Sequence, residues 1–367
     1  MRDLVVVGGG HAHVEVLRRF ALEPIPGTRL TAVLDHPISV YSGMVPGVVA
    51  GRYAPEQVEI DAAALARHAR ARVVIARLTR LDAGARRLFL DRADPISYDV
   101  ASLNLGSVTA GLERPGVAAH ALPVRPMADF LRRIRESATC DGRVPRAVVV
   151  GGGAGGVELA FALRRRLPRG RISIVEASAA LLPGAPTGLV RRVERRALVR
   201  GVELHLGRGV SAVEKGVLEL SDGERMAFDV LVWAAGARGV SALAASGLPL
   251  DARGFVLVEA TLQVVGQPHL FAAGDCAALR AFPETPKAGV HAVRQGPVLA
   301  SNLRALLEGR PLGRFRPQRD FLTLLNLADG TAAGSKWGVS FEGRWVMTLK
   351  DHIDRRFVAR YRSGAES

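Results

Sequence analysis

Cysteine is scarce in this sequence. Cys140 and Cys276 are the only two among 367 residues, and no Cys-x-x-Cys pair occurs. Two isolated cysteines exclude a disulfide framework, a four-cysteine zinc or iron–sulfur site and a redox dithiol of that type. We therefore expect a reducing cytoplasmic compartment, and we expect Cys276 to be a small buried residue rather than a nucleophile.

Long apolar runs are also missing. No stretch of 18 apolar residues occurs, which predicts that no helix spans a membrane. The first apolar strand begins by residue 4, which leaves no room for a signal peptide. Aromatic residues make up only 5% of the chain, and no basic segment is interleaved with them, so we expect no nucleic-acid partner. We expect no metal site.

Positive charge is in excess, because the formal net charge is +15 and most of it comes from arginine. Two interpretations stay open: attraction to anionic cofactors or to an anionic membrane face, or simply an arginine-rich solvated surface. The length of the chain and its 48% hydrophobic content predict two or three α/β domains rather than one core.

Two glycine-rich loops are the most informative motifs. Gly8-Gly9-Gly10-His11-Ala12-His13 and Gly151-Gly152-Gly153-Ala154-Gly155-Gly156 each follow four consecutive apolar residues. In a strand–turn–helix unit of this kind, the backbone N–H groups of the turn and the helix N-terminus attract a pyrophosphate. Two such units in one chain predict two dinucleotides brought face to face, a flavin and a nicotinamide.

In the first unit we expect Gly8, Gly9, Gly10, His11 and Ala12 to bind the cofactor. His13 stands where the fingerprint has its third glycine, and we expect it to pack or to form hydrogen bonds. A chemical role for His11 and His13 is left open.

Asp35, followed by His36, ends the next predicted strand 25 residues after Gly10. That spacing suits a carboxylate that accepts hydrogen bonds from an adenosine ribose, so we include both residues in the cofactor site. The alternative is a turn or helix cap. The irregular segment 37–60 either lies near the flavin ring or is a plain surface connection.

The second loop is a complete G-x-G-x-x-G, in which Gly151, Gly153 and Gly156 are the predicted nucleotide contacts. Glu176 ends the following strand and favours the 2′-OH of NADH over the 2′-phosphate of NADPH, and no arginine follows it directly. Glu158 lies in the first turn of the next helix, where it either interacts with the helix dipole or orients the nicotinamide and relays a proton.

A third motif lies downstream. Gly274 and Asp275 follow a short apolar strand, and the aspartate is placed to accept hydrogen bonds from the ribityl chain of FAD or to cap a helix. Lys287 and Ala288 precede a helix predicted over 290–307, so Lys287 either contacts the flavin edge or is a solvated surface lysine. Gly106 and Gly236 end two further apolar strands, and we add them to the cofactor site.

Taken together, these motifs resemble the FAD-dependent pyridine nucleotide-disulfide oxidoreductase superfamily over nearly the whole chain. Within it the chain is similar to type II NADH dehydrogenases and, more distantly, to sulfide:quinone oxidoreductases, whose redox cysteines it lacks. A narrower subfamily, which also occurs fused to selenophosphate synthetase, is resembled by three stretches of the sequence: the residues around His11, Tyr41-Ser-Gly-Met-Val-Pro-Gly47, and 287–296.

The resemblance implies two Rossmann-like, doubly wound α/β domains plus a small C-terminal α+β region. We expect an FAD domain formed by 1–112 and 246–310, an inserted NAD(P)H domain over 113–245, and a cap or interface over 311–367. The implied activity is hydride transfer from NADH, with NADPH as the other option, onto flavin and then to a quinone-type acceptor, with Glu158 and Lys287 as catalytic residues. A reductase of a selenium or sulfur compound and a non-catalytic flavin sensor are the alternatives.

The C-terminal segment has an apolar repeat at every fourth residue, flanked by basic side chains: Leu349, Ile353, Phe357 and Tyr361. This stripe predicts an amphipathic helix. The helix either lies peripherally on the inner face of the membrane or packs on its own domain or on a second subunit, which leaves a homodimer open.

Overall fold

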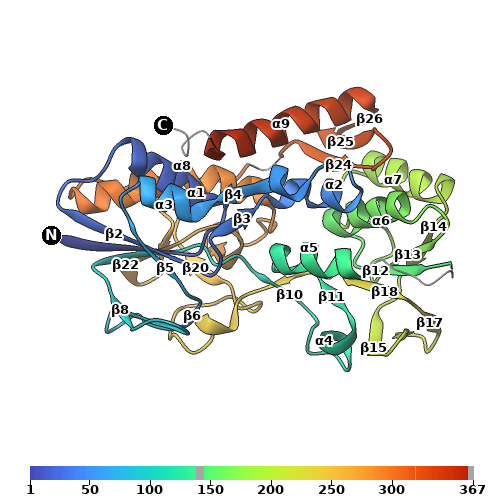
Figure 1. The fold of residues 1–367 in the computed structure, drawn as a ribbon, viewed down its shortest axis with the longest axis horizontal. Coiled ribbons are helices and arrows are strands. Elements are labelled where there is room, and N and C mark those ends of the chain that lie inside the picture. The colour runs from blue at the N-terminus through green and yellow to red at the C-terminus, as the bar shows by residue number, and fades with distance from the viewer. Residues whose placement is uncertain (138–143, 319, 363–367) are drawn as a thin grey trace.

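The computed structural model describes residues 1–137, 144–318 and 320–362, and Figure 1 shows two separate sheets of strands beside each other. Cys140 lies outside the described residues. The larger sheet takes its strands from both the beginning and the second half of the described chain. In spatial order these are β23 (Ala277–Leu279), β20 (Val256–Val258), β21 (Gln263–Val264), β22 (Gln267–Ala272), β9 (Val100–Leu103), β1 (Arg2–Val7), β2 (Thr28–Leu34) and β5 (Arg72–Ile75).

The second sheet lies between these two sequence segments and is parallel throughout. Its order is β11 (Leu122–Pro123), β18 (Val230–Trp233), β12 (Arg146–Val150), β13 (Arg171–Glu176) and β14 (Val202–Leu206). The central strands of both sheets are buried, which is why they read as continuous apolar runs in the sequence. The predicted mixed α/β fold is confirmed.

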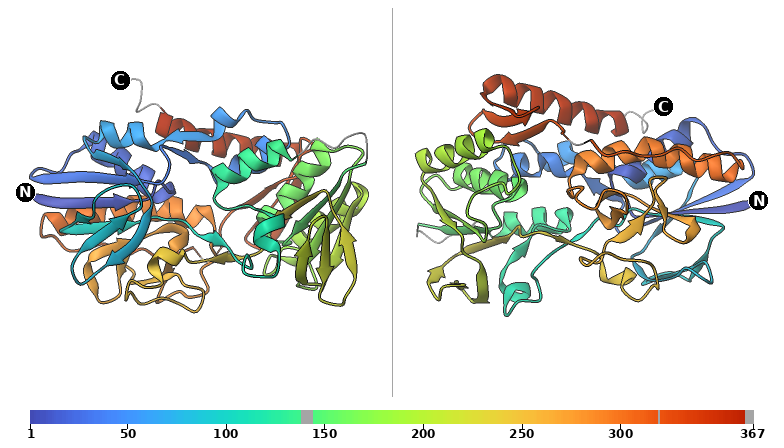
Figure 2. Two further views of the ribbon diagram at one scale, coloured as in Figure 1. Left: turned by 60° about the horizontal axis from the view of Figure 1, so that its bottom comes forward. Right: turned by 180° about the vertical axis from the view of Figure 1, so that it is seen from behind.

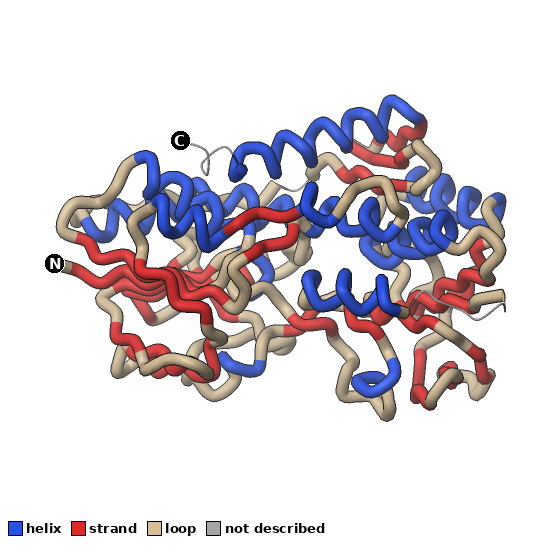
Figure 3. The backbone as a smooth tube through the Cα atoms, viewed as in Figure 1, coloured by secondary structure: helices blue, strands red, loops and turns tan. Residues whose placement is uncertain are grey.

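Helices cover one side of each sheet, as the blue tubes above the red strands in Figure 3 show. Over the larger sheet lie α1 (His11–Leu22), α3 (Ala62–His68) and α8 (Gly289–Leu307), and over the smaller sheet lie α6 (Ala154–Arg166) and α7 (Thr187–Val199). Shorter helices are α2 (Val45–Val49), α4 (Val117–His120) and α5 (Met127–Glu136).

Small antiparallel sheets replace a crossover helix in each half. The first is β6 (Leu78–Asp82), β7 (Arg87–Leu90) and β8 (Ile96–Ser97), and the second is β15 (Val210–Glu214), β16 (Val217–Leu220) and β17 (Arg225–Ala227). A short pair, β10 (Val108–Thr109) with β19 (Ala237–Arg238), joins the two halves of the molecule.

One local expectation needs correction, and one long helix was not predicted. The segment 37–60 is ordered rather than irregular: β3 (Ile38–Val40) pairs with β4 (Glu59–Asp61) around the buried helix α2. Pro46 occupies the first turn of α2, where proline costs no hydrogen bond. Helix α7 was not predicted, since its buried face is only Leu189, Val193 and Ala197 among many arginines.

The C-terminal region is a three-stranded sheet with one long helix. Strands β24 (Thr323–Asn326), β25 (Ala332–Lys336) and β26 (Val339–Gly343) run directly into α9 (Arg344–Arg362). Figures 1 and 2 show α9 lying over both halves, with its beginning near α7 and its end near α1.

The predicted apolar stripe of α9 does not form a single exposed face. Phe357 and Tyr361 are buried, whereas Ile353 is 41% exposed. A residue every four positions advances 40° beyond a full turn, so the four side chains spread over about 120° of the helix surface. Only the last two of them are buried. The described part of the chain contains no helix that is long and apolar enough to cross a membrane.

Candidate functional site

The first glycine loop is closed by the side chain of Asn104. Its Oδ1 accepts the backbone N–H of Ala12 and of His13 at 3.2 and 3.3 Å, and its Nδ2 donates to Ala273 O at 2.7 Å. A Cβ atom on Gly10 would lie 2.3 Å from Oδ1, and one on Gly8, which has φ +96°, would lie 2.4 Å from Asn104 O. The two glycines are therefore required for this close approach.

His13 packs inside the loop, as expected. It is fully buried, Nδ1 lies 2.7 Å from Gly8 O and Nε2 lies 2.8 Å from Ser102 Oγ. Burial lowers its pKa to about 4, so the ring is neutral. The missing third glycine of the fingerprint is thus replaced by a ring that holds the loop through hydrogen bonds.

His11 begins α1 and lies among aromatic rings. Its ring centroid is 5.4 Å from that of Tyr41 and 5.7 Å from that of Phe357 on α9. Among the described residues, Nε2 has no hydrogen-bond partner, and burial lowers the pKa of the ring. The structure therefore places the end of α9 against the first loop.

The other predicted contacts of this half lie at one edge of the larger sheet. Asp35 and His36 directly follow β2, with Asp35 exposed, and Gly9 lies at the end of β1 beside Leu34. Gly106 follows β9 and has φ +68°. The carboxyl ends of parallel strands are where such folds bind ligands.

Gly274 and Asp275 complete this edge. Gly274 N donates to Gln295 Oε1 at 2.6 Å, which ties the turn after β22 to α8. Asp275 receives Arg125 Nη2 at 3.3 Å and Ser107 Oγ at 3.4 Å, and the aspartate is only partly buried. Cys276 is buried as expected, and burial raises the pKa of its thiol to about 11.

The second glycine loop is equally tight. A Cβ on Gly156 would lie 1.9 Å from Gly151 O, and one on Gly151 would lie 2.7 Å from Ala234 O, whereas Gly153 has open space. Glu176 Oε2 accepts the N–H of Gly152 at 2.6 Å. The carboxylate at the end of β13 therefore holds the loop as well as facing the cleft.

A cleft of about 680 Å³ lies between the two halves. It is lined by the second loop, by Glu158 on α6, by Glu176 and Gly236 at the ends of strands of the smaller sheet, by Ser42, Val45 and Pro46 from the segment 37–60, and by Lys287 from the larger half. The two predicted catalytic residues thus line one cavity, although they are 129 positions apart in sequence.

Lys287 is not a solvated surface lysine. Its Nζ donates to Ala277 O and lies 4.0 Å from the centroid of the Phe255 ring. Burial lowers its pKa. The next residue, Ala288, is the N-cap of α8, so Lys287 lies directly beside the N-terminus of that helix.

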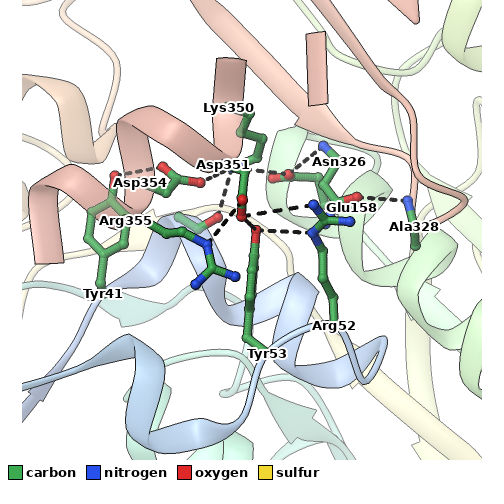
Figure 4. Close-up of polar contacts among 11 residues, drawn as sticks. Tyr41, Arg52, Tyr53, Glu158, Asn326, Ala328, Lys350, Asp351, Asp354 and Arg355 are labelled. Carbon is green, nitrogen blue, oxygen red and sulfur yellow. Dashed lines mark hydrogen bonds and ion pairs between the residues drawn. The ribbon is translucent and has the colours of Figure 1, made fainter. Parts of the chain in front are cut away.

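Glu158 is buried in a polar network that joins α6 to the C-terminal region (Figure 4). Its Oε1 accepts Asn326 N–H at 2.8 Å and lies 3.9 Å from Lys350 Nζ. Lys350 also donates to Asp354 Oδ2 at 2.8 Å and to Gly43 O at 2.9 Å. Burial raises the pKa of Glu158 to about 7, against the opposing charge of Lys350.

The network continues toward the first loop, because Tyr41 Oη donates to Asp354 Oδ1 at 3.1 Å. Sequence reasoning missed Asn104, Lys350 and Asn326. Asn104 lies near the end of a strand that the sequence predicts over 98–105, where its polar side chain is the one signal, and Lys350 was interpreted only as a basic flank of the α9 stripe. Within residues 1–137, 144–318 and 320–362, no three His, Cys, Asp or Glu side chains are placed to hold a metal ion.

Comparison with known proteins agrees with this geometry. The model of the family described as pyridine nucleotide-disulphide oxidoreductase matches residues 2–296. The NADH dehydrogenase-like protein YutJ of Bacillus subtilis is 25% identical over 319 residues, 87% of each chain. The type II NADH:quinone oxidoreductase of Staphylococcus saprophyticus is 28% identical over 317 residues, 78% of this chain and 77% of the relative.

Among solved structures, the sulfide:quinone oxidoreductase of Aquifex aeolicus superimposes with a TM-score of 0.81. The match covers 99% of this chain and 92% of that chain at 16% sequence identity. At that identity the similarity shows the fold alone, and it includes the C-terminal region beyond residue 296.

Proposed function

This chain belongs to the pyridine nucleotide-disulphide oxidoreductase family, and from that premise we propose that it is an FAD-dependent enzyme that oxidises NADH and reduces a quinone-type acceptor. The observation that carries the proposal is the cleft in which the second glycine loop, Glu158 and Lys287 meet. FAD, held by the first glycine loop and the turn at Gly274 and Asp275, would supply the redox chemistry that links oxidation of the nicotinamide to reduction of the acceptor.

The residues of the first half fit FAD. A Cβ atom on Gly8 or Gly10 would overlap Asn104, so only glycine allows the tight turn whose backbone N–H groups are presented to a pyrophosphate. Gly274, Asp275 and the N-terminus of α8 lie along the same sheet edge. We assign FAD to 1–112 and 246–310, NADH to 113–245, and a cap function to 311–367.

NADH rather than NADPH is supported by the charges near Glu176. Arg208, one of the arginines that line the cleft, donates its backbone N–H to Glu176 O at 3.0 Å, and its guanidinium is occupied by Asp222 and Glu224, each at 2.6 Å. A 2′-phosphate would therefore meet the Glu176 carboxylate without a free arginine to compensate it.

Glu158 is suited to hold and release a proton beside the cleft. A carboxyl with a pKa of about 7 is protonated about half the time at neutral pH, and Lys350 keeps its ionised form tolerable inside the protein. Reduction of a quinone consumes protons as well as electrons, so a buried acid at this position would supply a proton to the reaction. Lys287 places a positive charge at the opposite wall.

An anaerobic titration of the purified yellow protein with NADH, followed by a soluble quinone, tests the proposal. We expect NADH to bleach the flavin absorption, NADPH to do so far less efficiently, and the quinone to restore the colour. Gly156→Ala should block bleaching by NADH but not by dithionite, because its Cβ would lie 1.9 Å from Gly151 O.

Gly155→Ala is the matched control, because a Cβ at that position has open space. If neither nucleotide bleaches bound FAD in the unaltered protein, the proposed hydride donor is wrong. A sulfur or selenium donor, in keeping with the resemblance to the flavoproteins fused to selenophosphate synthetase, or a sensor role would then replace it.

A further inference from the structure

Two buried carboxyls share one lysine between α6 and α9 (Figure 4). Glu158 comes from α6, Lys350 and Asp354 come from α9, and the three residues are 5% to 8% exposed. We call these three residues the buried triad. Two carboxylates and one ammonium give a net charge of −1, and an uncompensated charge is costly inside a protein. A proton on one of the two carboxyls therefore stabilises the folded state.

The hydrogen bonds of the buried triad place the positive charge beside Asp354. Lys350 Nζ donates to Asp354 Oδ2 at 2.8 Å and to Gly43 O at 2.9 Å, whereas Glu158 Oε1 lies 3.9 Å from Nζ. Two of the three N–H groups of the ammonium are thus engaged by acceptors other than Glu158. Tyr41 holds Asp354 in turn, because its Oη donates to Oδ1 at 3.1 Å. Burial raises the pKa of Tyr41, so its hydroxyl stays a donor.

Glu158 is the member of the buried triad that gains the proton. Its Oε1 accepts the N–H of Asn326, and its side chain lines the cleft. Burial raises the pKa of both carboxyls, as expected for two acids that share one cation, and the pKa of Glu158 reaches about 7. Asp354 has the closer ammonium and the tyrosine hydroxyl, so its ionised form is the better stabilised of the two.

The other charged groups near the buried triad are engaged elsewhere. Arg52 and Arg355 approach Asp351 at 3.9 and 3.0 Å, and their side chains are 38% and 50% exposed, so water screens them. Helix α2, which packs on α6, carries no charged side chain. Apart from the exposed Arg171, the charged side chains of the strands that pack on α6 have other partners: Arg146 with Asp229, Glu176 with Gly152 N–H, Glu203 with Ser173 Oγ, and His205 with Glu203.

We propose that Asp354 is a positioning residue for Glu158: it holds the Lys350 ammonium beside itself and so leaves Glu158 as the carboxyl that binds and releases a proton at the cleft. The inference rests on the proton-holding role proposed above for Glu158, and it names the residue that sustains this role. Without the charge of Asp354, the buried triad is neutral when Glu158 is ionised. Glu158 then has a much weaker affinity for a proton.

Infrared spectroscopy of the FAD-loaded protein tests the proposal. A protonated carboxyl has a C=O stretching band that an ionised carboxylate lacks. Glutamate that carries a heavy carbon isotope in its side-chain carboxyl shifts this band only if the proton is on a glutamate. We expect a band that titrates at about pH 7, shifts with the labelled glutamate and is absent from Glu158→Gln.

Asp354→Asn should lower the midpoint of this titration by at least about one pH unit, which is a tenfold weaker affinity for the proton, because the whole charge of Lys350 then acts on Glu158. Tyr41→Phe removes one hydrogen bond from Asp354 and should lower the midpoint by a smaller amount. This second variant keeps the proposal testable if Asp354→Asn does not fold. FAD content and far-UV circular dichroism report whether each variant is folded.

Asp351→Asn is the matched control. It removes the same charge from the same helix, but Asp351 accepts hydrogen bonds from Tyr53 Oη at 2.6 Å and from Arg355 Nε at 3.0 Å instead of binding Lys350. The midpoint of the titration should therefore stay at its value in the unaltered protein.

Three results would overturn the inference: a midpoint that Asp354→Asn leaves unchanged, an equal fall in Asp351→Asn, or a band that does not shift with labelled glutamate, which would place the proton on Asp354. Absence of any band that titrates near neutral pH would remove the proton-holding role of Glu158 as well. The titration involves neither NADH nor an acceptor, so bleaching of the flavin by NADH decides separately whether the proposed hydride donor is correct.

Discussion

Glu158→Gln should change how the stability of the protein depends on pH. The pKa of Glu158 is raised from 4.5 to about 7 by burial, so the folded protein keeps this proton where the unfolded chain has released it. Between these pH values the folded state binds more protons than the unfolded state, and its free energy of unfolding therefore falls as the pH rises. Glutamine keeps an oxygen for Asn326 N–H but cannot ionise.

The magnitude follows from the shift. A difference of roughly 2.5 pKa units corresponds to about 3 kcal/mol over the whole window, and about 2.5 kcal/mol of it falls between about pH 5 and about pH 8. We expect the unaltered protein to lose this amount relative to Glu158→Gln over that interval. Other titrating groups cancel in the comparison, because both proteins share them.

Urea unfolding of both proteins at the two pH values, at one fixed FAD concentration, measures the difference. Glu113→Gln is the control, because the Glu113 side chain is 64% exposed and should give no such difference. If the unaltered protein and Glu158→Gln lose the same stability between the two pH values, Glu158 does not hold a proton at neutral pH, and its proposed role in proton supply falls with it.

Three further predictions follow from the same contacts. Gly10→Ala should reduce FAD retention and destabilise the protein by about 1–3 kcal/mol, because its Cβ would lie 2.3 Å from Asn104 Oδ1. Gel filtration measures the release of FAD and urea unfolding measures the stability, and an unaffected variant would contradict the loop geometry. Glu176→Gln should lower the preference for NADH over NADPH in steady-state kinetics by removing the repulsion of a 2′-phosphate; an unchanged ratio would mean that another group selects the nucleotide. Lys350→Met should destabilise the protein by about 3–5 kcal/mol, since it leaves the Asp354 and Glu158 carboxyls buried without their cation. Adding Asp354→Asn should recover part of the loss. Thermal melts of the single and double variants test this, and equal melting temperatures would refute the coupling.

The glycine loops show how much of the site is local. The backbone contacts that a dinucleotide needs depend on glycine conformations and on the order strand–turn–helix. Both are determined by residues that are consecutive in the sequence. The strands β1, β2, β12 and β13 that flank the two loops, the helices α1, α6 and α8 and the burial of Cys276 were therefore predicted correctly, whereas β3, β4, β20 and β21 were not predicted. Helix α7 was missed, because its short apolar face is outnumbered by arginines whose partners come from the distant hairpin.

The sequence by itself determined the α/β fold, the two glycine-rich loops and the acidic residues that follow them, Asp35 after β2 and Glu176 at the end of β13. These are properties of short segments with their own periodicity. Only the tertiary structure decided which side chains meet. Glu158 lies 168 positions before Asn326 and 192 positions before Lys350, and their encounter depends on how the C-terminal region packs over both halves. The same packing turned Phe357 and Tyr361 inward and left Trp345 and Ile353 outside, since a helix buries whichever side its neighbours cover.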